Sequence, residues 1–305
     1  MKFVLYACLL ASQFVCHALH SQYYLSSNNK PETAWMWEAG ASLGGMNCLT
    51  DIGGTSGVGK KFIKDINWSQ IKFCAAFFAS TTWQSKLALR LEATAGQIEG
   101  SDAVLKNSTD MARNRYLRNL RFKTSILELA ITGELHVVTI LYNNADLPLF
   151  SPYLVAGIGV FKYNPQAPLN NRWVDLRPLH TEGQAFKEYP ERRSYSSASW
   201  CLPAGLGIKY DRAGAINLRL EILYRITGTD YLDDVSNRYI NPALFSKYLS
   251  PPNAAMANML ADRSAELSSG VKNNKDAIRG NPANKDAYFS CSFKISLALA
   301  RIQGK

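Results

Sequence analysis

Along much of the chain, apolar and polar residues alternate one by one. From residue 87 to residue 95, for example, every second position holds leucine or alanine. The charged residues Lys86, Arg90 and Glu92 lie on the opposite face. A period of two places alternate side chains on opposite faces of a strand, whereas an amphipathic helix repeats every 3.6 residues. Eight segments show this period: residues 35–48, 69–80, 86–98, 124–136, 152–162, 200–210, 217–227 and 288–300. The pattern predicts eight strands of roughly 10–14 residues, long enough to cross a membrane when tilted.

The links between these segments alternate in length. Short links are expected at residues 81–85, 137–151 and 211–216. Long links are expected at residues 49–68, 97–123, 163–199 and 228–287. Compact soluble domains rarely contain such long connections. The chain is therefore predicted to be all-β: an eight-stranded antiparallel transmembrane barrel of the outer membrane, with short periplasmic turns and long extracellular loops. A soluble sandwich with solvated polar faces is the alternative.

The first 21 residues read as an export signal. Lys2 precedes an apolar stretch over residues 4–15, and the small residue Ser21 ends the segment. Residues 22–305 then form a single barrel domain, which we expect in the outer membrane.

Composition narrows the class further. The 13 Phe, 15 Tyr and 6 Trp exclude a disordered chain. No apolar run after residue 20 reaches the ~20 residues of a spanning helix. The net charge is +10, and it becomes +9 once Lys2 is removed with the signal. Four cysteines remain after cleavage: Cys48, Cys74, Cys201 and Cys291. They allow three disulfide pairings, and unpaired, half-buried thiols are the alternative.

If the apolar face meets lipid, the polar face fills the lumen, which in an eight-stranded barrel has room only for side chains. Strand parity places five acids and five bases there: Glu38, Glu92, Glu128, Glu134 and Glu221 with Arg90, Lys209, Arg219, Arg225 and Lys294. Buried charges are tolerated when they are paired and hydrogen-bonded. Equal numbers therefore favour a plugged, self-neutralised interior over a pore.

A basic run lies in the second long link. Its cations interleave with apolar residues: Arg113, Arg115, Arg118, Arg121 and Lys123. In an exported barrel we expect these side chains to contact anionic lipopolysaccharide phosphates at the rim rather than nucleic acid, and a merely solvated charge run is the competing reading.

Catalysis and cofactor binding are not expected. After signal cleavage only His136 and His180 remain, too few for a three-His zinc site. His136 is followed by two valines, so the His-x-Ser spacing of a lipid hydrolase is absent. Residues 54–60 nearly match a phosphate-binding loop, but Lys61 stands where the magnesium-binding hydroxyl belongs.

Four strings remain, at residues 152–165, 173–184, 229–236 and 279–282, the last followed by Asp286. Together they resemble the PorG-like outer-membrane barrels of the type IX secretion system of Bacteroidota. The resemblance runs over residues 37–299. It implies a non-enzymatic barrel that associates on its periplasmic side with a ring of PorK- and PorN-like proteins, in protein secretion and in some members gliding motility. No catalytic residues carry over.

The chain is therefore predicted to anchor or organise this periplasmic ring assembly; a stand-alone OmpA-like barrel that acts through its outer loops is the alternative. The expected partner contact lies in residues 141–150, at Asp146, Pro148 and Phe150. In the outer loops, Asp230, Asp233 and Asp234 have a spacing that suits Ca²⁺ binding. The preferred interpretation is that nearby Arg225 or Arg238 forms ion pairs with these acids.

Overall fold

The computed structural model describes residues 33–53, 68–107, 110–141, 149–211, 215–267 and 272–303. The predicted export signal and the glycine-rich residues 54–60 lie outside these ranges.

Eight antiparallel strands close into a barrel. They are β1 (Thr33–Leu49), β2 (Lys72–Trp83), β3 (Leu87–Ser101), β4 (Arg121–His136), β5 (Phe150–Leu169), β7 (Ala198–Asp211), β8 (Ile216–Thr227) and β9 (Ala287–Gln303). Neighbours in sequence pair with each other, β1 pairs with β9, and a β4–β5 pairing completes the ring. A closed ring leaves no unpaired strand edge within a membrane. The predicted all-β, eight-stranded antiparallel barrel is confirmed.

Shorter elements decorate the ends of the barrel. The additional strand is β6 (Arg172–Asp175), and the helices are α2 (Asp110–Arg118), α3 (Val137–Leu141), α4 (Ala243–Tyr248) and α5 (Pro251–Leu260). Single 3-10 turns are η3 (Trp68–Gln70), η4 (Asp102–Leu105), η5 (Arg177–Leu179) and η6 (Ser264–Glu266). None of the helices in the described ranges has the length and apolar character needed to cross a membrane.

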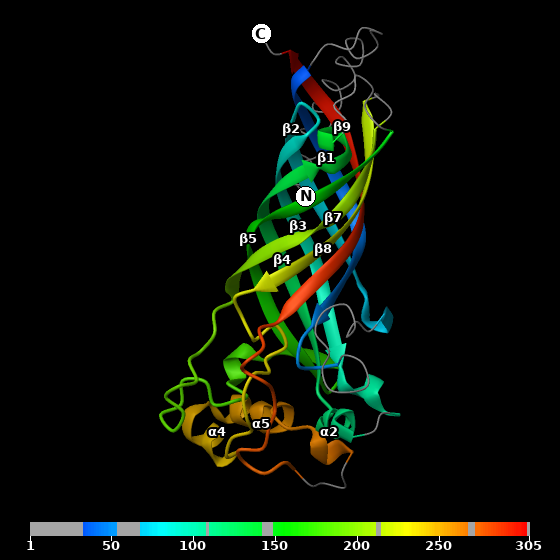
Figure 1. Ribbon diagram of the computed structural model, residues 1–305. Helices are drawn as coiled ribbons and strands as arrows, with labels where there is room; N and C mark the ends of the chain where they lie inside the picture. The colour runs from blue at the N-terminus through cyan, green and yellow to red at the C-terminus, as the bar shows by residue number, and fades with distance from the viewer. Residues whose placement is uncertain are drawn as a thin grey trace.

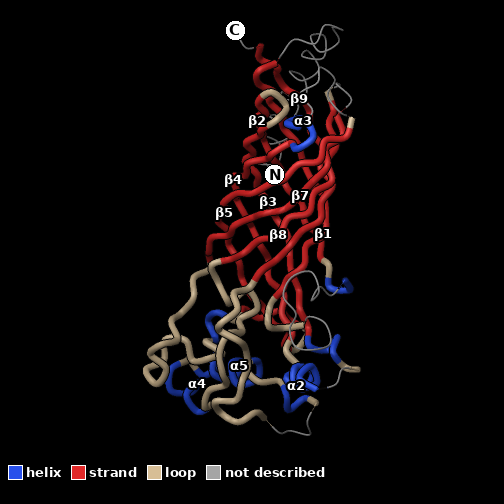
Figure 2. Tube along the Cα trace, in the orientation of Figure 1, coloured by secondary structure: helices blue, strands red, loops and turns tan. Residues whose placement is uncertain are grey.

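The two ends of the barrel differ. Helices α2, α4 and α5 gather with the long connections at one end, whereas the last strand, β9, runs out toward the C-terminus at the other (Figure 1). Loops and turns dominate the first end, and strands extend almost to the second (Figure 2). Below, these are called the loop end and the turn end. In an outer-membrane barrel they are the extracellular and periplasmic ends.

Strand boundaries differ from prediction mainly where tight turns lack glycine. The link expected at residues 81–85 is a tight turn between Trp83 and Lys86, whose amide bonds the Trp83 carbonyl at 2.9 Å. Its central residues, Gln84 and Ser85, both have positive φ, as the favoured hairpin turns require, although neither is the glycine or asparagine that usually signals one. Strand β2 therefore begins and ends about three residues later than the predicted segment.

Strand β5 is also longer than predicted. It continues to Leu169 and turns through Asn170 and Asn171, both at positive φ, into β6. An Asn-Asn pair between extended segments is a hairpin signal, so part of the long loop expected at residues 163–199 is a projecting hairpin.

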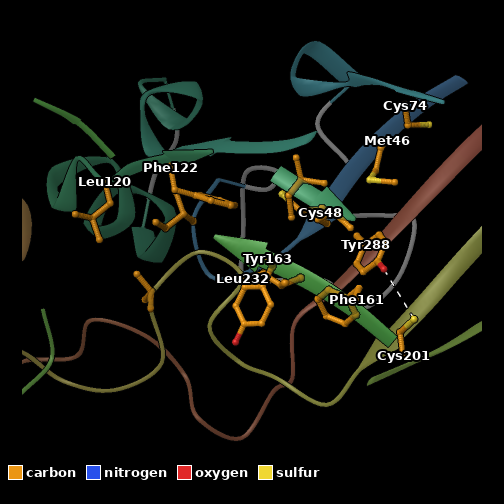
Figure 3. Packing of buried hydrophobic residues seen from close by; sticks show 14 residues of the cluster. Met46, Cys48, Cys74, Leu120, Phe122, Phe161, Tyr163, Cys201, Leu232 and Tyr288 are labelled. Atoms are coloured by element: carbon orange, nitrogen blue, oxygen red, sulfur yellow. Dashed lines mark hydrogen bonds between the residues drawn. The ribbon is translucent and has the colours of Figure 1, made fainter. Parts of the chain in front are cut away.

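An apolar cluster closes the barrel interior at the loop end (Figure 3). It joins residues from the loop-end termini of the strands with Leu232 and Val235 from the connection after β8. Tyr288 donates a long hydrogen bond to the sulfur of Cys201, at 3.9 Å. All four cysteines of the described barrel are free thiols, three of them buried: Cys48, Cys74 and Cys201 within, Cys291 exposed. None of the three possible pairing schemes is therefore present.

A second apolar cluster lies beyond the barrel. It packs α4 and α5 against the β5–β6 hairpin through buried residues that include Phe186, Phe245 and Leu260. The described parts of the long connections are thus folded into a cap with its own core, which we call the outer cap: residues 101–107, 110–120, 170–197, 228–267 and 272–286.

Candidate functional site

The outer surface of the barrel is apolar. Outward leucines, isoleucines and phenylalanines are extensively exposed along all strands, with Phe77 at 76% and Leu127 at 59%. Exposed tryptophans mark the turn end at Trp35 and Trp83, which are paired across strands, and the loop end at Trp200. Contiguous apolar surface on this scale is not stable in water, and aromatic residues at both margins are typical of membrane–water interfaces.

The interior is the reverse of the surface. The structure places all ten predicted lumen charges inside the barrel, each buried: Glu38, Arg90, Glu92, Glu128, Glu134, Lys209, Arg219, Glu221, Arg225 and Lys294. Each of them makes at least one ion pair with another member of the set.

Arg90 of β3 is the centre of the largest group. Its guanidinium lies 2.6 Å from Glu134 on the neighbouring strand, 2.9 Å from Glu221 across the lumen and 3.0 Å from Glu92. Lys294 of β9 bridges Glu92 and Glu221 from the far side, at 2.5 and 3.0 Å. Three acids and two bases from four strands therefore share one network, in which no charge lacks a counter-ion.

Two smaller groups lie on either side along the barrel. Near the turn end, Glu38 accepts from Lys209 at 2.9 Å and also pairs with Arg219. Toward the loop end, Arg225 donates to Glu128 at 2.6 Å, and Tyr288 donates to the same carboxylate. Because these side chains span the lumen in successive layers and have almost no solvent contact, they block a continuous water path.

The outer cap contains a second buried ion network, which the sequence reasoning missed. Arg279 donates to Glu182 at 2.8 Å and to the Asp234 carbonyl at 2.7 Å, and its guanidinium lies 3.9 Å from the Asp234 carboxylate. Glu182 also accepts from the backbone amides of Ser236 and Asn237, at 3.0–3.1 Å. One acid–base pair thus ties the connection before β7 to two separate segments of the connection between β8 and β9. The only signal was that Glu182, Asp234 and Arg279 fall in the strings of the family resemblance.

Arg118 was predicted to contact lipopolysaccharide at the rim, but it is buried in this framework instead. Its guanidinium donates two hydrogen bonds of 2.8 Å to the Asp102 carboxylate and one of 2.5 Å to the Arg279 carbonyl. Arg115 turns inward as well, donating to the Gly53 carbonyl at 3.0 Å. Of the other predicted rim cations, Arg113 and Arg121 are exposed and Lys123 is partly buried.

The acidic residues of the cap are not pinned as predicted. Arg225 pairs with Glu128, and Arg238 donates to the Asp276 carbonyl. Neither arginine therefore pairs with the acids at residues 230–234. Asp233 instead accepts from the backbone amides of Ile52 and Val235, both at 2.9 Å. Within the described ranges, no three His, Cys, Asp or Glu side chains are placed to hold a metal ion.

Burial makes several of these acids hard to ionise. It raises the pKa of Asp230 to about 7 and, against the opposing effect of Arg279, that of Asp234 to about 6. Burial and the neighbouring Asp51 raise the pKa of Asp233, and burial and Asp233 raise that of Asp286. The cap therefore holds protons at pH values where the unfolded chain has released them.

Acidification is expected to tighten the outer cap. An acid whose pKa is raised by folding stabilises the folded form below its unfolded value near 4, and this contribution is lost as the pH rises through the folded value. For Asp230 and Asp234 that window ends between pH 6 and 7. Amide exchange of residues 229–236, corrected for its intrinsic pH dependence, should be slower at pH 5 than at pH 8.

Asp230→Asn should reduce this difference, whereas Asn at the exposed Asp276 serves as a matched control and should leave it unchanged. Equal protection of the wild-type cap at both pH values would contradict the assignment of bound protons.

The predicted partner contact is only partly described. Asp146 and Pro148 lie outside the described ranges. Phe150 begins β5 at the turn end and is 54% exposed, and its ring lies tilted against that of Tyr210 of β7, with centroids 5.2 Å apart. It is an exposed aromatic residue at the periplasmic margin.

An apolar outer belt around a lumen of paired charges defines the class of this protein, an outer-membrane β-barrel. No family model and no curated protein sequence matches the chain. Among solved structures it is similar to Neisserial surface protein A, with 8% identity and a TM-score of 0.36 over 87% of this chain and 97% of that one.

Two further similarities are of the same kind. Ail of Yersinia pestis, solved with the heparin analogue sucrose octasulfate, has 7% identity and a TM-score of 0.33, covering 88% of this chain and 98% of that one. AlkL, solved in DMPC bilayers, has 10% identity and a TM-score of 0.34, covering 92% and 96%. Similarity at this level does not support transferring a function from these proteins to the present chain.

Proposed function

We propose that this chain is a non-enzymatic outer-membrane anchor for the periplasmic ring of a type IX-like secretion system. The observation that supports it best is the filled lumen. A barrel whose interior is occupied by the Arg90 network offers no path for solute or cargo. Its length of 305 residues and large cap exceed what a minimal lipid-embedded barrel needs, which favours a role in assembly.

The arrangement of the cap supports the same proposal. The strings at residues 173–184, 229–236 and 279–282, which carry the resemblance to PorG-like barrels, meet in the Glu182–Arg279–Asp234 network. The strings that carry the resemblance are therefore joined by one buried ion network and are not independent surface loops.

A second candidate is a stand-alone barrel of the OmpA kind that acts through its outer surface. The ordered cap favours it, because α4 and α5 pack on an apolar core and present a fixed external surface. The two functions differ in which end of the barrel meets a partner.

Affinity purification from cross-linked, detergent-solubilised envelopes separates these candidates. With an affinity tag placed in the exposed loop around Lys275, the anchor function predicts that PorK- and PorN-like ring proteins co-purify. Phe150→Ala should lower their yield because it removes an exposed aromatic residue at the turn end. Phe73→Ala, which removes an exposed phenylalanine at the loop end, is the matched control.

Recovery of a solitary barrel, with or without cross-linking, would contradict the anchor function and leave the stand-alone barrel.

A further inference from the structure

One sector of the barrel wall changes from apolar to cationic at the loop end. The outward residues of β4 run from Leu135, Ile131, Leu129 and Leu127 through Ser125 to Lys123 and Arg121. On β5 the outward residues run from Ile158 and Val160 to Lys162.

The strand register places these cations at two heights in the same sector of the wall. Lys123 of β4 lies between Glu99 of β3 and Gln166 of β5, and Lys162 pairs with Leu127 two pleats below. Outward residues at the loop end of β8 and β9, by contrast, are the apolar Ile226 and Phe289. The cations therefore mark one sector of the rim, across β2 to β5.

The height of this sector matches a lipid headgroup. Lys123 is four residues beyond Leu127, about 14 Å along the strand. With a tilt of about 40°, Lys123 lies about 10 Å nearer the outer surface than Leu127. The headgroup layer on each side of the hydrocarbon core is about 5–8 Å deep. An ammonium here lies level with lipid phosphates, directly above side chains that contact acyl tails.

The β6 hairpin fixes these side chains in place. The ammonium of Lys123 lies 4.2 Å from the centre of the Trp173 ring, and the guanidinium of Arg121 lies 5.5 Å from it. Glu99 accepts from Arg121 and pairs with Lys72, both at 2.7 Å. One carboxylate thus neutralises part of the positive charge, while Lys123 and Lys162 have no carboxylate partner among the ion pairs of the described chain.

We propose that this sector, formed by Arg121, Lys123, Lys162 and Trp173, binds the phosphate of an anionic lipid in the outer leaflet. Lys123 donates charge-assisted hydrogen bonds to the phosphate oxygens, and the indole of Trp173 holds its ammonium at headgroup level. Lys162 begins level with Leu127 and extends its aliphatic stem toward the same headgroup layer. The acyl chains lie along Leu127, Leu129 and Val160. The apolar surface directly beneath the cations favours a membrane lipid over a free phosphate ion.

Lipid retention measured by native mass spectrometry tests the site. The barrel is reconstituted in nanodiscs of phosphatidylcholine with a minor fraction of phosphatidylglycerol or of phosphorylated lipid A, then released for analysis. The wild-type barrel should retain the anionic lipid selectively. Lys123→Gln with Lys162→Gln should lower retention about fivefold for each cation removed, the effect of one basic residue at an anionic membrane surface.

The double variant Lys187→Gln with Lys275→Gln removes two exposed lysines of the cap and is the matched control. Heat-modifiable migration on gels shows that every variant is folded. Equal retention of anionic lipid by both double variants would overturn the site, as would equal retention of phosphatidylcholine by the wild type. Displacement of the bound lipid by millimolar inorganic phosphate would overturn the assignment to a membrane lipid.

Discussion

An Arg90→Leu variant is expected to lose about 3–5 kcal/mol of its free energy of unfolding, because it removes one partner from a buried ion network. Arg90 is the only cation that contacts Glu134 within ion-pair distance among the described residues, apart from the more distant His136 at 3.4 Å. Without Arg90, Glu134 loses its closest counter-ion and keeps only the longer-range attraction of Arg219, while Glu221 depends on Lys294 for its ion pair.

The measurement is urea unfolding of the barrel in lipid vesicles, followed by tryptophan fluorescence. Arg113→Leu removes the same charge from an exposed helix position and should change stability by less than about 0.5 kcal/mol. Adding Glu134→Leu to Arg90→Leu should restore part of the loss, since an apolar pair of similar volume carries no unpaired charge. Equal unfolding curves for Arg90→Leu and Arg113→Leu would contradict the network as the basis of barrel stability.

Arg279→Ala is expected to open the outer cap while leaving the barrel folded. Its guanidinium is the counter-charge of Glu182 and also holds the carbonyls of Asp234 and Ala261. Removal of a buried cation of this kind costs about 3–5 kcal/mol, which exceeds the free energy that holds many loops closed. The cap should then sample open forms much more often than in the wild type.

Limited proteolysis from the loop end measures this opening. Cleavage within residues 177–195 and 228–286 should accelerate by at least ten times, while the barrel strands stay protected. Alanine at the exposed Arg193 is the control and should leave the cleavage rate unchanged. If the cap of Arg279→Ala resists protease like that of the wild type, the apolar core of α4 and α5 rather than the ion network holds the cap closed.

The barrel was predictable because each strand has two environments of opposite polarity. Lipid outside and a crowded lumen inside impose the period of two directly on the sequence. Boundaries failed where local chemistry was unusual. Gln84 and Ser85 form a tight turn without its usual residues, whereas Asn170 and Asn171 carried a hairpin signal that was overlooked. Both errors concern turns, where a single residue decides the geometry.

The lumen charges were predictable as a set but not as pairs. Parity assigns Arg90 and Glu221 to the interior, but whether they meet depends on the stagger between strands, which no local pattern records. The contacts within the outer cap were harder still to predict from the sequence. Glu182 and Arg279 are 97 residues apart and lie in irregular connections, so neither period nor parity applies. Arg118 is an example. The basic run around it predicted a surface contact, but the side chain is buried and paired with Asp102.

The filled lumen also constrains the order in which the barrel is made. Lys294 is in the last strand, yet it neutralises Glu92, which precedes it by 202 residues. Until β9 joins β1, an inserting intermediate would hold Glu92, Glu134 and Glu221 against the membrane interior with Arg90 as their only close cation among the described residues besides His136. Stepwise insertion of separate hairpins is therefore unfavourable. The lumen charges therefore favour insertion of the barrel as a nearly complete sheet over insertion hairpin by hairpin.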